Sequence, residues 1–71
     1  MSTISSYSDA KKNLDTLVAG TTEWTEALMK TNDEANKLLK LYPELEEYAS
    51  VDDNGVVSIS KEGLNYAAEQ E

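Results

Sequence analysis

The sequence predicts a mainly α fold: a small three- to four-helix bundle with one short β-hairpin near residues 51–59. Apolar residues recur at helical spacing from residue 7 to residue 42. Pro43 then interrupts this pattern, because proline cannot continue a helix in its interior. Asn54-Gly55 lies between two β-branched runs, which is the strongest short-range hairpin signal. With 71 residues, the chain should form a single helical domain over residues 1–71.

The first helix is expected over about residues 7–19. Ser6 followed three residues later by Asp9 resembles a capping box, with Asp in place of the preferred Glu. Gly20 supplies a stop, because glycine adopts the left-handed conformation at little cost.

The second helix is expected to begin after a cap at Thr21 or Thr22 and to reach Tyr42. Its apolar seam alternates steps of four and three residues, as in a coiled coil, with one polar interruption. Two large apolar residues, Leu39 and Leu41, flank the seam near its end, which favours packing inside a bundle over a dimeric rod. The seam consists of Trp24, Leu28, Thr31, Ala35, Leu38 and Tyr42.

A short third helix should run over about residues 43–49, since proline is well placed at a first helical position. In the hairpin that follows, Val57 and Ile59 should face inward, and Asn54-Gly55 should form the turn, because both residues tolerate positive φ. The last helix is expected over about residues 61–69. Ser60 would cap this helix, and Gly63 should weaken its first turn. The chain ends at Glu71 without a stop signal, which fits either a fraying end or excision from a longer parent chain.

Composition excludes several function classes. The chain has no Cys and no His, so it lacks disulfides, thiolate metal sites and the commonest general base. Its acids lie in runs that water should bathe, and its many Ser and Thr residues have no obvious activating base; we therefore predict no enzyme and no cofactor. No membrane span or secretory signal can be drawn.

The net charge is −8, and it is concentrated in the C-terminal part of the chain. Residues 1–42 carry five Lys and six acids, whereas residues 43–71 carry one Lys and eight acids. Such a charge repels phosphate backbones and anionic lipids, so we expect a protein partner and neither nucleic acid nor membrane. The carboxylates are either a solvated surface or an acidic contact face for a basic partner, and the candidate contact residues are Glu44, Glu46, Glu47, Asp52 and Asp53.

Two further features have competing interpretations. Residues 50–61 overlay an EF-hand calcium loop, but Ser50 stands at its first position and Lys61 at its last, where the site needs carboxylates, so the plain hairpin is favoured and no metal site is predicted. Trp24 is either a core anchor at one end of the bundle or an exposed contact residue, and the core role is the commoner one.

The stretch LLKLYPELEEYASVDDNGVVSISKEGLNY, within about residues 36–66, resembles helical segments in the tail tape measure proteins of long-tailed phages and prophages. In that family a leucine-rich helix ends in a Tyr-Pro-Glu-Leu-like corner, followed by an acidic Asn-Gly turn, a short apolar strand and a Glu-Gly-Leu restart. The resemblance implies a structural module whose partners are other tail proteins or further copies of itself, located in the virion or in the host cytoplasm. The alternative is a small acidic domain that occupies a basic surface of another protein, as an inhibitor or a nucleic-acid mimic does.

Overall fold

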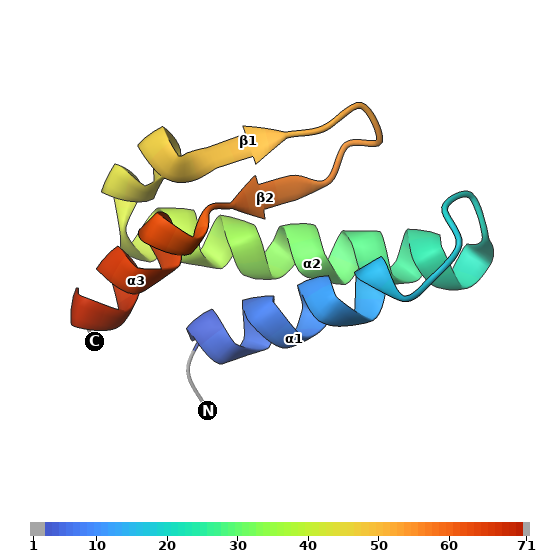
Figure 1. Cartoon of the computed structure of the whole chain (residues 1–71), viewed down its shortest axis with the longest axis horizontal. Coiled ribbons are helices and arrows are strands. Elements are labelled where there is room, and N and C mark those ends of the chain that lie inside the picture. The colour runs from blue at the N-terminus through green and yellow to red at the C-terminus, as the bar shows by residue number, and fades with distance from the viewer. Residues whose placement is uncertain (1–2, 71) are drawn as a thin grey trace.

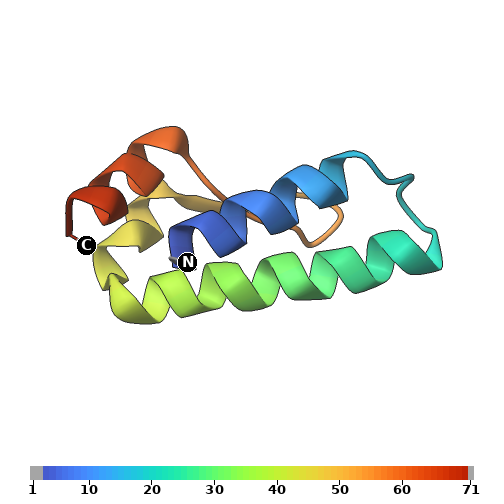
Figure 2. The same ribbon diagram turned by 90° about the horizontal axis from the view of Figure 1, so that it is seen from below.

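The computed structural model describes residues 3–70, and it confirms the mainly α class with a two-stranded hairpin (Figure 1). Two long helices, α1 (Thr3–Asp15) and α2 (Thr22–Leu41), run side by side. A 3₁₀ helix, η1 (Pro43–Tyr48), leads from α2 into the strands β1 (Ala49–Val51) and β2 (Val57–Ile59), and α3 (Lys61–Gln70) closes the described chain. Figures 1 and 2 show α3 at the end of the helix pair where α1 begins and α2 ends. The expectation about Glu71 lies outside the described residues.

The boundaries of α1 differ from the prediction. The helix already includes Thr3 and stops at Asp15, so Ser6 lies inside it and does not cap it. Ile4 extends the apolar stripe of the helix by one turn and packs against the main core, which explains the early start. Gly20 does take a positive φ of 92°, but it does so in the loop before α2 and not at the end of α1.

The second helix follows the prediction closely. Thr21 is its N-cap, accepting a hydrogen bond from the backbone N–H of Trp24 (3.2 Å), and Tyr42 is its C-cap. The seam packs within the molecule against α1, η1 and β2, as the bundle interpretation expects. Thr31 is fully buried in that seam, and its hydroxyl donates to the carbonyl of Ala27 (2.8 Å), so the polar group has a partner there.

The hairpin has the predicted location, and its turn uses positive φ at one residue. Ala49 pairs with Ile59, Ser50 with Ser58 and Val51 with Val57 in antiparallel register. Only Gly55 has positive φ (84°), whereas Asn54 does not. The N–H of Gly55 donates to the carbonyl of Asp52 (3.0 Å), which makes a β-turn followed by a left-handed glycine, the common three-residue hairpin loop.

The start of α3 shows why a glycine stands in its first turn. Ser60 accepts from the backbone N–H of Gly63 (3.2 Å), so it caps the helix as expected. A Cβ on Gly63 would lie 2.6 Å from Tyr48 Cβ and 3.0 Å from Ile59 Cγ2. The glycine therefore permits close packing of α3 against η1 and β2.

The core is divided into two clusters. The main cluster joins all the helices and the hairpin, and its buried members are Tyr7, Ala35, Leu38, Leu45, Ile59 and Ala67. A smaller cluster at the other end contains Leu14, Ala27 and Val56, with half-buried Trp24 packed against it. Trp24 thus anchors one end of the bundle through part of its ring surface. Of the residues predicted to face inward in the hairpin, Ile59 is buried and Val57 half-buried.

Asp52 organises the turn, and its removal should loosen the hairpin. Its Oδ1 accepts from the backbone N–H groups of Asn54 (2.9 Å) and Val56 (3.0 Å). We expect Asp52→Ala to destabilise the domain by about 1 kcal/mol, because two amide donors lose their acceptor and water compensates them only in part. Urea unfolding followed by circular dichroism measures this effect. Asp53→Ala, which changes the neighbouring exposed carboxylate, serves as the matched control, and an equal loss in both variants would contradict the assigned role.

Candidate functional site

The two edges of the hairpin have opposite characters, and this difference defines the candidate site. Two bonds mark the hydrogen-bonded pairs at the ends of the ladder. The N–H of Asp52 donates to the carbonyl of Val56 (3.1 Å), and the N–H of Ser60 donates to the carbonyl of Tyr48 (2.9 Å). In an antiparallel ladder such pairs alternate with pairs whose backbone groups point away from the partner strand. Ala49 and Val51 therefore point their backbone N–H and C=O groups outward from the β1 edge. Val57 and Ile59 point theirs outward from the β2 edge.

Side chains of the two long helices close the β2 edge. Asn32 of α2 accepts from the N–H of Val57 (2.9 Å) and donates to the carbonyl of Gly55 (2.9 Å). The hydroxyl of Tyr7, from α1, accepts from the N–H of Ile59 (3.0 Å) and lies 3.4 Å from the carbonyl of Val57. These two side chains, here called the edge clasp, occupy the positions that a third strand would take. Neither was singled out in the sequence, because each bond joins residues far apart in the chain.

The β1 edge is open. The N–H of Ala49 bonds to the carbonyl of Glu46 at the end of η1, while within residues 3–70 the carbonyl of Ala49 and both backbone groups of Val51 have no bonded partner. The Val51 side chain is 66% exposed. Figure 1 shows β1 as the outer strand, with β2 between it and the helices. This edge is the side of the sheet that another chain can reach.

A groove runs between the open edge and α2. Its volume is about 470 Å³. The apolar part of its lining comes from Leu39, Ala49, Val51 and Val57, and the polar part from Asn36, Glu46 and Ser50. Leu39 was predicted only as an apolar flank of the helical seam. In the structure its side chain is half-buried and borders this groove as well as the main core.

The five predicted acidic residues all lie at the surface, but the structure splits them into two groups. Glu44, Glu46 and Glu47 lie on η1, directly before β1, while Asp52 and Asp53 lie directly after it. Because β1 spans only about 10 Å, the two groups bracket the open edge. We call this arrangement the acidic frame.

The cations of the described chain leave the acidic frame uncompensated. Within residues 3–70 the ion pairs are Lys11–Asp15 (2.8 Å) and Lys37–Glu34 (3.2 Å), and neither involves a frame residue. Glu44 lies close enough to Tyr66 of α3 for its charge to act on the phenol: desolvation first, and the negative charge of Glu44 next, raise the pKa of Tyr66. The charge of Glu44 thus reaches α3.

The turn is not arranged as a metal site. Asp52 directs Oδ1 at two backbone amides of its own turn, as a hairpin requires. Nowhere in residues 3–70 do three or more carboxylates gather closely enough to hold a metal ion. The hairpin interpretation of residues 50–61 agrees with the observed strands and turn.

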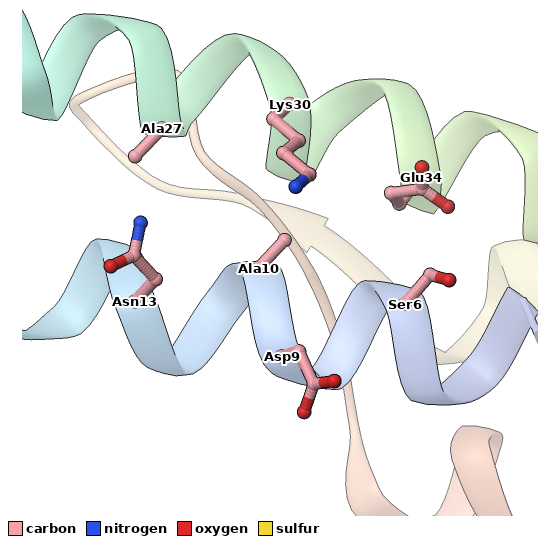
Figure 3. Close-up of a pocket in the computed structure, with 7 residues that line it drawn as sticks. All are labelled: Ser6, Asp9, Ala10, Asn13, Ala27, Lys30 and Glu34. Carbon is pink, nitrogen blue, oxygen red and sulfur yellow. The ribbon is translucent and has the colours of Figure 1, made fainter. Parts of the chain in front are cut away.

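A second hollow lies between α1 and α2 (Figure 3). Its volume is about 410 Å³, and two small residues, Ala10 and Ala27, form its floor. Figure 3 shows the Lys30 side chain reaching towards α1, while Asp9 turns away from α2. The polar side chains around this hollow therefore do not all point into it, and we do not assign it as the site.

None of the helices within residues 3–70 combines the length and the apolar composition that a membrane-spanning helix needs. Comparison with known proteins found no matching family model, no similar curated protein and no similar solved structure.

Proposed function

We propose that this chain is a non-enzymatic protein-interaction module. The observation that carries the proposal is the acidic frame: five exposed carboxylates beside an open strand, without a cation bonded to them within residues 3–70. Uncompensated charge of one sign steers partners of the opposite sign and raises the rate of encounter. The partner should therefore present a basic surface.

The resemblance of residues 36–66 to tail tape measure proteins extends this proposal to a specific setting. In that setting the chain is a structural module, its partners are other tail proteins or further copies of itself, and it acts in the virion or in the host cytoplasm. The second candidate is an acidic binder, a small acidic domain that occupies a basic surface of another protein. The acidic frame favours this candidate. Contact through apolar packing should persist at high salt, whereas contact through the frame should weaken as salt screens it.

Binding of a labelled decalysine tests the acidic binder, with fluorescence anisotropy at low and high salt as the measurement. Neutralising four frame residues should weaken binding about tenfold or more, because each removed charge lowers the local potential. Asp52 is kept, since it holds the turn. The variant is Glu44→Gln, Glu46→Gln, Glu47→Gln and Asp53→Asn. The control removes four exposed acids of α1 and α2, namely Asp9→Asn, Glu23→Gln, Glu26→Gln and Asp33→Asn.

Sedimentation velocity of the unmodified chain at the same two salt concentrations tests the structural module. Self-association that is insensitive to salt supports that setting, and selective loss of decalysine binding in the frame variant supports the acidic binder. A chain that stays monomeric and loses decalysine binding equally in both variants contradicts the proposal.

A further inference from the structure

The open edge of β1 has three properties that belong together: unpaired backbone groups, an adjacent apolar groove and acidic residues at both ends. We propose that this edge binds an extended peptide segment of a partner, with basic residues near its two ends, as a third strand of the sheet. The inference rests on the proposed interaction function and specifies how the partner is held.

The backbone supplies the first part of the argument. A strand laid beside β1 can donate to the carbonyls of Ala49 and Val51 and accept from the N–H of Val51. Strand addition at an exposed sheet edge gains affinity from such main-chain bonds. The β2 edge is a poorer site, because the edge clasp already bonds the N–H groups of Val57 and Ile59 and the carbonyl of Val57.

The groove supplies the second part. Side chains of an added strand alternate between the two faces of the sheet. Those on the face towards α2 would meet the apolar lining given by Leu39, Val51 and Val57. A β-branched apolar side chain in the middle of the segment would pack against this lining, and β-branched residues also favour the strand conformation.

The charge of the acidic frame indicates which kind of segment the β1 edge would bind. The acidic frame places carboxylates at both ends of β1, so a segment with Lys or Arg near both of its own ends is complementary to the edge in either direction. A second copy of this chain is the opposite case. Pairing β1 with its own copy, parallel or antiparallel, brings the acids of one copy next to those of the other, and such like-charge pairs destabilise the contact.

The test uses an acetylated and amidated probe peptide, Lys-Thr-Val-Thr-Val-Lys, titrated into the ¹⁵N-labelled chain. The control peptide Lys-Thr-Pro-Pro-Val-Lys has the same charge, but its adjacent prolines remove backbone donors on both edges. We expect the probe to shift the amide resonance of Val51 and to slow its hydrogen exchange, and to bind about tenfold or more tightly than the control.

The matched variants are Val51→Pro and Val51→Thr. Proline at residue 51 removes the outward N–H without touching the ladder to β2, and edge strands tolerate it. Threonine keeps both the N–H and a β-branched shape. Val51→Pro should abolish the preference for the probe and Val51→Thr should retain it, with thermal unfolding showing that both variants are folded.

The outcomes separate this inference from the proposed function. Equal binding of probe and control peptides, with both weakened by the four frame substitutions, overturns strand addition but leaves the acidic interaction surface standing. Failure of both peptides to bind overturns strand addition and the acidic interaction surface together. A dimer that Val51→Pro dissociates would show that the occupant of the edge is a second copy, and would also overturn the inference.

Discussion

Tyr7→Phe should destabilise the domain by about 1–3 kcal/mol, although it removes a single oxygen atom. The Tyr7 side chain is only 2% exposed, and its hydroxyl accepts the N–H of Ile59 in a buried hydrogen bond. Without the oxygen, that amide stays buried and unpaired, which costs more than the net value of an ordinary hydrogen bond. Urea unfolding monitored by circular dichroism gives the difference in unfolding free energy.

The second member of the edge clasp gives a sharper form of this prediction. Asn32→Ala should also destabilise the domain, because the N–H of Val57 and the carbonyl of Gly55 both lose their partner. The two side chains hold the same strand, so the loss in the double variant should differ from the sum of the two single losses by about 0.5 kcal/mol or more. A chain of this length has a total stability of roughly 4–10 kcal/mol, so the double variant should approach the unfolding limit.

Tyr66→Phe is the matched control for Tyr7→Phe. Tyr66 is half-buried, and its hydroxyl makes no side-chain hydrogen bond within residues 3–70. Its loss should change the unfolding free energy by less than about 0.5 kcal/mol. Equal effects at residues 7 and 66 would show that the hydroxyl of Tyr7 does not hold the strand.

The edge clasp explains how a two-stranded sheet exists in so small a fold. An isolated two-stranded hairpin is only marginally stable in water. In this protein the side chains of Tyr7 and Asn32 make the hydrogen bonds to β2 that a third strand would otherwise make. By closing the β2 edge, the clasp also fixes which edge remains available. The interaction surface proposed for β1 therefore depends on residues of α1 and α2 that do not belong to it.

Elements with local signals were predictable from the sequence. The cap at Thr21, the corner at Pro43 and the turn ending in Gly55 each depend on residues within a few positions of one another, and each lies where it was expected. The start of α1 was predicted wrongly because Ser6 and Asp9 imitate a cap. The contact of Ile4 that extends the helix is made with distant parts of the chain.

The candidate site was predictable only in part. The exposure of the acidic residues followed from their charge, but their division around β1 depends on the length of η1 and on the hairpin register. The open edge could not be deduced at all. It is defined by the bonds of Tyr7 to residues about 50 positions away and of Asn32 to residues about 25 positions away, for which the sequence has no local signal.

Gly63→Ala should be the other strongly destabilising substitution, with a net loss of about 1–3 kcal/mol. Helix propensity alone predicts the opposite sign, since alanine in a helix interior is favoured over glycine by about 1 kcal/mol. The added Cβ, however, would lie 2.6 Å from Tyr48 Cβ. That atom is fixed to the backbone of η1, so no change of rotamer can move it away, and α3 must shift as a whole.

The shift has a further consequence that separates it from a loss of helix propensity. The same Cβ would meet Ile59 Cγ2 at 3.0 Å, so relief of the clash displaces α3 from both η1 and β2. Hydrogen exchange of Ser60, whose N–H bonds to the carbonyl of Tyr48, should therefore accelerate together with that of α3. Asn65→Ala, at an exposed position of the same helix, should instead leave exchange at Ser60 unchanged and stabilise slightly. If Gly63→Ala also stabilised the domain, that result would contradict the close packing of α3 against η1.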